Sequence, residues 1–360
     1  MIEQGDSFML IENPVGTNGF EFLEFTTAQP QKLCDQFSSL GFHKIAHHHT
    51  QDATIFQQGD IRFIINMSPS EHTEEFRAAH GASVSAMGFK VKNAKAAFEH
   101  CMKLGANNYI PTNGNIMPEV PAIYGVGNSL IYFIDSHSPN YHKYFSYLPI
   151  PIKSESAGLT YIDHVTHNLF RGNMDEWADF YTRLFNFREI RYFDIEGKLT
   201  GLKSRAMTSP CGKIRIPLNE SADDKSQIEE FLKEFNGEGI QHIALGTDNI
   251  YSSITTLRQN GIDFLDTPDT YYDLLSTRLP NHGEPVEKLK QNRILLDGDS
   301  EKKKLLLQIF TKNMLGPVFF EIIQRKGDDG FGEGNFRALF ESIELDQIQR
   351  GVLSAEKADA

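Results

Sequence analysis

The stretch Gly81-Ala82-Ser83-Val84-Ser85-Ala86-Met87-Gly88-Phe89 has a counterpart later in the chain, Gly237-Glu238-Gly239-Ile240-Gln241-His242-Ile243-Ala244-Leu245, in the same register and without a gap. In both copies apolar residues alternate as in a strand, and residues with helical spacing follow up to Gly105 and Gly261. A strand, a turn, a helix and a terminal glycine that agree in order indicate a repeated unit. We therefore expect one structural plan to be used twice.

A second matched unit precedes each copy. The apolar runs at 20–25 and 161–169 are each followed by a segment with helical spacing. The stretch 148–152 contains two prolines, which disfavour a continuous helix or a central strand and suit a connector. Since 360 residues exceed one ordinary core, we predict two α+β domains, residues 1–150 and 155–360, each with a curved sheet around a cavity.

The composition excludes several classes of partner. The formal net charge of -13 and the pI near 5.5 give no electrostatic footprint for a nucleic acid or an anionic membrane. No stretch reaches the roughly 18 apolar residues of a membrane span, and the acidic N-terminus does not resemble a signal peptide. Three cysteines without CxxC spacing indicate neither a disulfide framework nor a zinc knuckle. We expect a cytoplasmic protein.

Three polar residues interrupt apolar strands of the second half. His164 lies in the run 161–169, His242 lies in 240–245, and Glu321 is the one charged residue in 318–323. A buried imidazole needs a partner, and an ionised carboxylate is costly to bury unless it meets a base or a cation. Each residue alone also fits a core or surface role, but the three together predict a metal site.

The first half supplies a comparison within the same chain. Ala86 stands where the second half has His242, Phe22 stands approximately where it has His164, and the strand at 130–134 is apolar where Glu321 would fall. Residues needed only for packing should occur in both copies. This asymmetry predicts one metal site, in the second half.

The ligand types favour iron. Two imidazoles and one carboxylate that leave positions open are typical of non-haem Fe(II) oxygenases. Zinc accepts the same groups, but the His-Glu-x-x-His helix of many zinc enzymes is absent from the sequence. His167 has odd spacing from His164 and is expected on the other strand face, beside the site or at the surface.

At these residues the chain resembles the 4-hydroxyphenylpyruvate dioxygenase family of the vicinal-oxygen-chelate superfamily. The resemblance covers nearly the whole chain and rests on a series of short motifs. They are Ile162-Asp163-His164-Val165-Thr166-His167-Asn168, Pro217-Leu218-Asn219-Glu220, Gln241-His242-Ile243-Ala244, Gln308-Ile309-Phe310-Thr311, Phe320-Glu321-Ile322-Ile323-Gln324-Arg325 and Gly330-Phe331-Gly332-Glu333-Gly334-Asn335-Phe336.

The resemblance implies a fold, a reaction and a set of site residues. The fold is two tandem vicinal-oxygen-chelate domains of repeated βαβββ units, each an open barrel-like sheet. The reaction consumes 4-hydroxyphenylpyruvate and O2 and yields homogentisate and CO2 in tyrosine catabolism, with one Fe(II) per chain held by His164, His242 and Glu321. The implied catalytic residues are Gln241, Asn219, Gln308 and Phe336. The implied substrate pocket is Ser204, Pro217, Asn219, Gln227, Gln241, Gln308, Phe310, Phe319, Phe331, Asn335 and Phe336. Without the resemblance, Phe310 also fits a core position and Asn219 a turn.

Residues 335–353 read as a C-terminal helix after a glycine-rich stretch, and such a tethered helix is suited to close over the site as a lid. The resemblance further implies a homodimer or homotetramer. Two alternatives stay open. One is a 4-hydroxymandelate synthase, which has the same fold, iron and substrate but hydroxylates the benzylic carbon. The other is a metal-free binding protein of the same fold.

Overall fold

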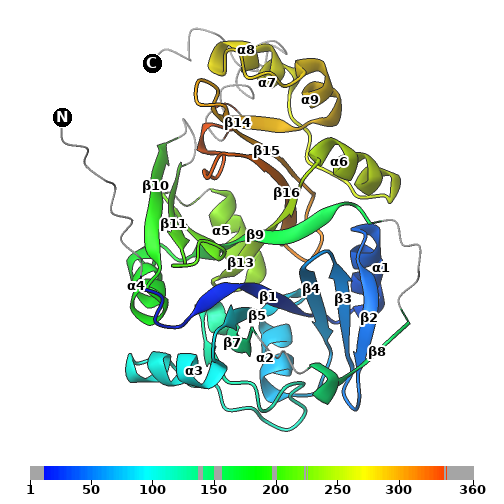
Figure 1. The fold of residues 1–360 in the computed structure, drawn as a ribbon, viewed down its shortest axis with the longest axis vertical. Coiled ribbons are helices and arrows are strands. Elements are labelled where there is room, and N and C mark those ends of the chain that lie inside the picture. Colours follow the sequence, from blue (N-terminus) through cyan, green and yellow to red (C-terminus); the bar gives the residue numbers. More distant parts are fainter. Residues whose placement is uncertain are drawn as a thin grey trace, which may run out of the picture.

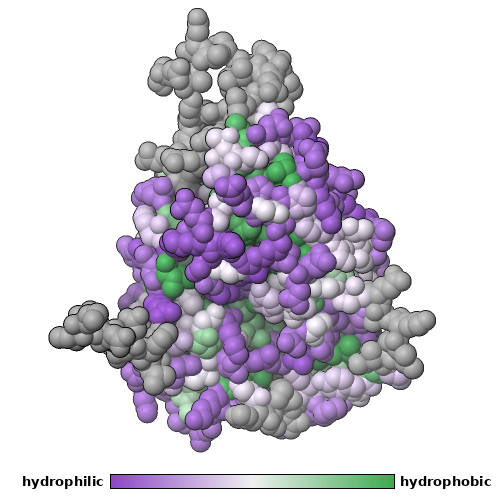
Figure 2. Space-filling model, turned by 45° about the horizontal axis from the view of Figure 1, so that its top comes forward, coloured by the Kyte–Doolittle hydropathy of each residue, from purple (hydrophilic) through white to green (hydrophobic). Residues whose placement is uncertain are grey.

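The computed structural model describes residues 12–136, 141–149, 156–196, 201–222, 224, 226–335 and 338. These residues form two eight-stranded sheets that follow each other along the chain. Figure 1 shows the first sheet from blue to bluish green and the second from green to red, each curled around its own interior. The face in Figure 2 is mainly hydrophilic, with apolar residues in small separate patches.

The first sheet has the strand order β6-β7-β5-β1-β4-β3-β2-β8. Its strands are β1 (Thr17–Thr26), β2 (His43–His48), β3 (Ala53–Gln58), β4 (Ile61–Asn66), β5 (Ser83–Val91), β6 (Ala122–Tyr124), β7 (Leu130–Asp135) and β8 (Phe145–Tyr147). The helices of this half are α1 (Pro30–Ser39), α2 (Glu71–His80) and α3 (Ala94–Lys103).

The second sheet has the order β10-β11-β12-β9-β13-β16-β15-β14. Its strands are β9 (Leu159–Leu169), β10 (Arg188–Glu196), β11 (Gly201–Thr208), β12 (Arg215–Ser221), β13 (Gly239–Thr247), β14 (Leu295–Asp299), β15 (Lys304–Phe310) and β16 (Phe319–Lys326). Its helices are α4 (Met174–Phe185), α5 (Gln227–Phe235), α6 (Ile250–Gln259), α7 (Asp269–Asp273), α8 (Leu275–Arg278) and α9 (Val286–Asn292).

The predicted repeat is confirmed by the strand pairing. β1 and β5 form an antiparallel central pair in the first sheet, as β9 and β13 do in the second. β1 also pairs in parallel with β4, and β9 with β12, while β5 and β13 pair in parallel with β7 and β16. Both halves are therefore curled open sheets with the same connections, as the sequence predicts.

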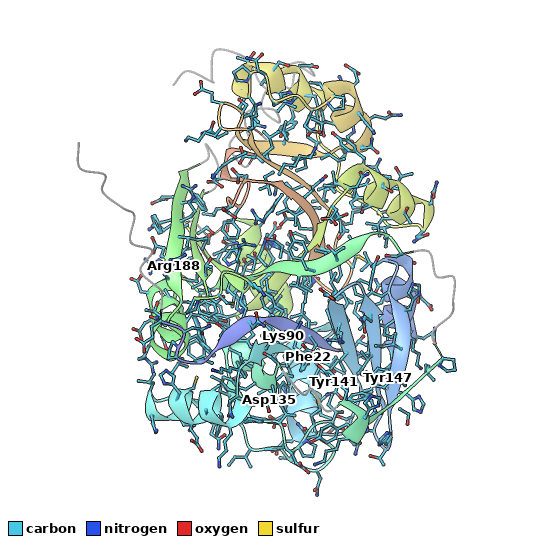
Figure 3. All side chains as sticks on the ribbon, viewed as in Figure 1. Phe22, Lys90, Asp135, Tyr141, Tyr147 and Arg188 are labelled. Carbon is cyan, nitrogen blue, oxygen red and sulfur yellow. The ribbon has the colours of Figure 1, made fainter. Side chains whose placement is uncertain are left out.

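The register identifies which residues of the first half stand at the positions of the three candidate ligands. His164 lies opposite Ala244, as Phe22 lies opposite Gly88. Ala86 occupies the place of His242, and Tyr132 that of Glu321, because β5 and β7 pair as β13 and β16 do. The Phe22 and Tyr132 rings lie 5.8 Å apart, and Figure 3 shows Phe22 within the first sheet. Aromatic packing thus fills this position in the first half.

The start of α4 is held by carboxylates from other segments of the second half. The helix begins at Met174, next to Asn173, but the Asn173 side chain makes no capping hydrogen bond. It donates instead to Glu238 Oε1, at 2.8 Å, and the Met174 backbone N–H donates to Glu220 Oε2, at 3.2 Å. The free backbone N–H at the start of α4 is thus satisfied by Glu220 of β12, which is far from the helix in the sequence.

The two halves share one apolar core rather than touching at a polar seam. Phe63 of β4 packs against Phe320 of β16 with ring centroids 6.0 Å apart, and His80 of α2 stacks on Phe235 of α5 at 4.4 Å. The main cluster of buried apolar residues is continuous across both sheets. The second half therefore packs directly on the first through apolar side chains.

The predicted C-terminal helix falls largely outside the described residues. Residues 333–335 and 338 are helical, and the rest of 335–353 is not described, so the predicted lid stays a prediction. Among the helices within the described ranges, none has the length and apolar character of a membrane span.

Candidate metal centre

The three predicted ligands lie on neighbouring strands, β9, β13 and β16. Ala244 of β13 faces His164 on one side and Glu321 on the other. His242 precedes Ala244 by two residues and so shares its face of the sheet. All three side chains therefore project from one face, around the small side chain of Ala244.

The ligand atoms of these side chains converge. The distance from His164 Nε2 to Glu321 Oε2 is 3.2 Å, and from His242 Nε2 to the same oxygen 3.6 Å. The three ligand atoms lie within 4.8 Å of one another, and all three residues are buried. Donors that share a metal at about 2.1 Å are separated by distances of this size. The donor set fits a single ion.

A neighbouring side chain fixes the tautomer of each histidine. His164 Nδ1 donates to Asp163 Oδ1 at 2.8 Å, and His242 Nδ1 donates to Gln241 Oε1 at 2.9 Å. Each neutral ring therefore carries its proton on Nδ1 and turns its Nε2 lone pair toward the other ligand atoms. In His242 this lone pair accepts a hydrogen bond from the Thr166 hydroxyl at 2.9 Å, and a bound metal would take the place of that bond.

Strand alternation alone would not place these partners beside the histidines, and a β-bulge explains each case. In the pairing of β9 with β13, Asp163 is an extra residue between Ile162 and His164, and Gln241 is an extra residue between Ile240 and His242. A bulge redirects a side chain that alternation would send to the other face. The first half has the same two irregularities, at Glu21 and Ser85.

Asp163 belongs to a buried charged pair. Arg325 of β16 donates to both of its oxygens, at 2.7 and 2.8 Å. Burial alone would raise the pKa of Asp163, but hydrogen bonds from Arg325 and His164 hold that pKa below its ordinary value. Arg325 also donates to the backbone carbonyls of Asp328 and Gly330. It thus links His164 to the segment that leads to the C-terminal helix.

The histidine pKa values shift in opposite directions. Burial would lower the pKa of His164, but the nearby carboxylates of Glu321 and Asp163 raise it overall. The pKa of His242 is lowered well below its ordinary value, first by burial and then by His164. His242 is therefore neutral at physiological pH, which is the form that binds metals.

Aromatic rings border the three candidate ligands. Phe319 stacks on His242, with centroids 4.9 Å apart and an interplanar angle of 17°, and Phe310 lies 6.4 Å from the same ring. The Phe331 ring lies 5.3 Å from His164. Phe336 lies outside the described residues.

Two of the predicted amide residues form a chain of hydrogen bonds that ends at Glu321. Gln308 Nε2 donates to Glu321 Oε1 at 3.3 Å, and Asn335 Nδ2 donates to Gln308 Oε1 at 2.9 Å. Both amides are buried. The oxygen of Glu321 that faces the histidines is therefore Oε2, and Oε1 faces Gln308.

The remaining predicted polar residues lie farther along the same sheet. Ser204 of β11 is directly opposite Asn219 of β12, which is opposite Asn168 of β9. Pro217, two residues from Asn219, shares its face. Gln227 is exposed at the start of α5, and no hydrogen bond among the described residues joins it to this group.

Asn168 was not among the expected pocket residues, and the expected surface position of His167 is wrong. The Asn168 amide is fully buried, and neither of its polar atoms has a hydrogen-bond partner within the described parts of the chain. His167 is also fully buried, and the Tyr181 hydroxyl of α4 lies 3.1 Å from its Nε2. Asn168 shares the face of His164 by even spacing, which was the available signal.

Comparisons with known proteins agree with this geometry. The family profile described as "Hydroxyphenylpyruvate dioxygenase, HPPD, N-terminal" matches residues 11–146, and that of the "Glyoxalase/Bleomycin resistance protein/Dioxygenase superfamily" matches 161–277. The chain is 55% identical to a 4-hydroxyphenylpyruvate dioxygenase of Legionella pneumophila over 95% of this chain and 98% of that protein. It is 53% identical to the enzyme of that name from Pseudomonas aeruginosa, over 95% and 97% of the two chains.

Two other relatives carry different names. Hemolysin VllY of Vibrio vulnificus is 55% identical over 95% of this chain and 98% of that protein. Among solved structures, a mutant of 4-hydroxymandelate synthase from Streptomyces coelicolor superposes with a TM-score of 0.78, at 26% identity, over 92% of this chain and 99% of that one.

Proposed function

The chain belongs to the 4-hydroxyphenylpyruvate dioxygenase family, and from this membership we infer that it converts 4-hydroxyphenylpyruvate and O2 into homogentisate and CO2. Both oxygen atoms of O2 are used: one enters the new carboxylate of the shortened side chain and the other becomes the new ring hydroxyl. The carboxyl group of the 2-oxo acid leaves as CO2. The product belongs to the breakdown of tyrosine, and hence of phenylalanine.

The observation that carries this proposal is the buried group of His164, His242 and Glu321. It presents two imidazole nitrogens and one carboxylate oxygen to a common point. We propose that these residues hold one Fe(II) per chain, since this donor set with open positions is typical of non-haem iron oxygenases. When bound there, iron would supply a Lewis-acidic centre that the 2-oxo acid chelates and that activates O2.

The surrounding residues divide the proposed pocket into two ends. Near the ligands, Gln241 and Gln308 would hold the 2-oxo acid, and Phe310, Phe319 and Phe331 would enclose the ring and exclude water. At the far end, the phenol hydroxyl would meet a polar row across three strands. We assign to this row the predicted Ser204 and Asn219 together with Asn168, whose unpartnered amide supports the assignment. Pro217, Gln227, Asn335 and Phe336 stay proposed pocket residues from family resemblance.

We further propose a division of labour between the halves. Residues 155–360 would carry the chemistry, and residues 1–150 would support them and take part in assembly as a homodimer or homotetramer. The shared core supports the first role, because β16, which carries Glu321, packs on β4 through Phe320 and Phe63. Cys34, Cys101 and Cys211 are free, which suits the reducing cytoplasm that we propose as its location.

A second candidate function is 4-hydroxymandelate synthesis. The chain shares its fold with the Streptomyces coelicolor synthase over nearly its whole length, and this similarity keeps the reaction as the alternative. The two reactions share substrates and differ in the carbon that is hydroxylated. Identification of the product by mass and retention time separates the two reactions. Homogentisate supports the dioxygenase, whereas 4-hydroxymandelate would show that the chain is a synthase.

The deciding experiment measures bound iron and O2 uptake that depends on 4-hydroxyphenylpyruvate. Wild type should bind one iron and consume O2, and Glu321→Gln should lose both. Glu24→Gln is a matched control, because Glu24 is a buried strand glutamate of the first half that lies far from the three ligands in the fold. It should keep both properties. A wild-type protein without iron and without uptake would favour the metal-free binding protein instead.

A further inference from the structure

A chain of hydrogen bonds leads from Glu321 to a part of the fold remote from the other ligands. Gln308 Nε2 donates to Glu321 Oε1, and Asn335 Nδ2 donates to Gln308 Oε1. On its other side, Asn335 Oδ1 accepts from the Tyr271 hydroxyl at 2.6 Å and from Arg278 Nη2 at 3.1 Å. Tyr271 and Arg278 lie on α7 and α8, beside β14 at the top of Figure 1.

The two ends of this chain determine its direction. Arg278 only donates hydrogen bonds, and an ionised Glu321 only accepts them. Between them lie the amides of Gln308 and Asn335. Each amide has a donating nitrogen and an accepting oxygen of similar size, so shape alone would allow either orientation. Because Arg278 requires Asn335 to present its oxygen, Asn335 must present its nitrogen to Gln308, which in turn presents its nitrogen to Glu321.

We propose that Arg278 and Tyr271 are positioning residues of the metal centre. By orienting Asn335, and through it Gln308, they keep Glu321 Oε1 occupied and leave Oε2 to face the two histidines. A carboxylate with one oxygen held in this way offers a single ligand atom, which keeps positions open for substrate and O2. This inference rests on the proposed function, since it gives Glu321 the role of a metal ligand.

Burial makes the direction of the chain costly to reverse. Tyr271, Gln308 and Asn335 are buried, so a reversed amide would place two acceptors face to face without water. Arg278 is itself held in place. It donates to the Leu296 carbonyl at 2.6 Å and pairs with Asp297 at 3.3 Å.

Asp297 connects the same arginine to the segment that carries Asn335. Its second oxygen accepts from the Gly334 backbone N–H at 2.8 Å. The Leu296 N–H donates to the Tyr271 hydroxyl at 2.9 Å, so β14 fixes both donors. Arg278, Tyr271 and the residue they orient thus form one rigid group.

The direction of the chain is tested by comparing Asn335→Asp with Asn335→Ala. The metal-free, full-length protein is titrated with Co²⁺ alone, and the affinity is read from its visible absorption. Aspartate matches asparagine in shape but presents an acceptor to Gln308, which must then turn its oxygen toward Glu321. Alanine merely frees Gln308. We expect Asn335→Asp to weaken Co²⁺ binding by about 10- to 100-fold and Asn335→Ala to weaken it less.

This order is opposite to the one that other roles predict. If Asn335 only filled space, the aspartate of equal shape would be the milder change. If charge alone mattered, an added carboxylate would strengthen the binding of a cation. Co²⁺ affinity in Asn335→Asp equal to or above that in Asn335→Ala would overturn the proposal.

A second set of variants acts on the far end of the chain. Arg278→Met and Tyr271→Phe should each weaken Co²⁺ binding by about tenfold and lower kcat more than KM, with circular dichroism unchanged. Tyr272→Phe is the matched control, because it removes a buried hydroxyl from the next residue of α7, outside the chain of hydrogen bonds. It should bind Co²⁺ as wild type does.

The outcomes separate this inference from the proposed function. If wild type binds metal and is active while Arg278→Met and Tyr271→Phe both match Tyr272→Phe, the positioning role is wrong and the enzyme assignment stands. If wild type binds no metal, the proposed function fails first.

Discussion

At the scale of single residues, the buried charge of Asp163 is the most demanding feature of the molecule. Its side chain is 0% exposed, and Arg325, which is 10% exposed, supplies two of its hydrogen bonds. Within a protein interior such a charge persists only with a partner of this kind. Asp163 in turn holds His164, so stability and the metal centre depend on the same pair.

Removal of Arg325 should therefore be severe. We expect Arg325→Met to lower the free energy of unfolding by about 3–5 kcal/mol, because the buried Asp163 carboxylate loses its two short hydrogen bonds from Arg325 and keeps only the His164 ring and a 3.5 Å contact with Arg215. Urea unfolding of the metal-free protein measures this directly. Arg171→Met is the control, since Arg171 pairs with carboxylates at the surface and should matter little. Equal effects of the two substitutions would contradict this account.

Glu24 predicts a pH dependence that comes from the first half. Burial raises the pKa of Glu24 to about 7, although hydrogen bonds from Asn66 and Ser85 lower it. The unfolded chain releases this proton near the ordinary pKa of 4.5, while the folded chain keeps it until about pH 7. The contribution of Glu24 to the free energy of unfolding is therefore greatest below pH 4.5. It declines by roughly 3 kcal/mol between pH 4.5 and pH 7 and is constant above pH 7.

The variant Glu24→Gln isolates this effect because it cannot ionise. Urea unfolding of both proteins at pH 5 and pH 7.5 gives two differences in the free energy of unfolding. Wild type should lose stability relative to Glu24→Gln as the pH rises. A difference that does not change with pH would show that Glu24 is ionised in the folded protein.

At the scale of elements, apolar periodicity predicted the strands, the helices after them and the repeat. It did not predict the bulges at Asp163 and Gln241, because an extra residue in a strand leaves no mark in an apolar run. The three candidate ligands could be singled out from the sequence because the two halves differ at those positions. Arg325, Tyr271 and Arg278 were not, since their partners come from distant segments whose approach only the fold creates.

The segment before the C-terminal helix contains a position where a single methyl group should disturb the site. Gly332 has a φ of +78°, and a Cβ there would overlap the Gln308 amide. We expect Gly332→Ala to displace Gln308 and to reduce both Co²⁺ affinity and turnover by at least about tenfold. The readouts are Co²⁺ titration and 4-hydroxyphenylpyruvate-dependent O2 uptake.

Gly212→Ala is the control for Gly332→Ala, because it has the same backbone strain but makes no new contacts. Its φ is +72°, and a Cβ there would meet nothing within 4 Å. Both substitutions should cost about 1–2 kcal/mol of stability through the left-handed backbone. Only Gly332→Ala should affect metal and turnover, and an equal loss in Gly212→Ala would mean that strain alone is responsible.

At the scale of the whole molecule, the shared core couples the halves. Since apolar packing continues from the first sheet into the second, the two sheets should unfold together. Metal bound in the second half should then protect strands of the first half as well. At a free metal concentration 100 times Kd, the stabilisation should be about 2.7 kcal/mol.

Hydrogen exchange resolved along the sequence measures this coupling. Addition of Co²⁺ to the metal-free chain should slow exchange in β1 and β5 as much as in β9 and β13, and chelation should reverse it. Glu321→Gln should show no change in either sheet. Protection confined to the second sheet would mean that the halves open separately.

The recurrence of the two bulges in the first half has a consequence for the cost of binding. Glu21 and Ser85 occupy the same irregular positions as Asp163 and Gln241, although Phe22 and Ala86 stand there in place of ligands. The backbone shape around the site is therefore a property of the repeat itself and does not depend on an ion. The proposed metal centre is therefore preorganised. Its ligands are already aligned in the folded protein, so binding an ion should require little rearrangement of the chain.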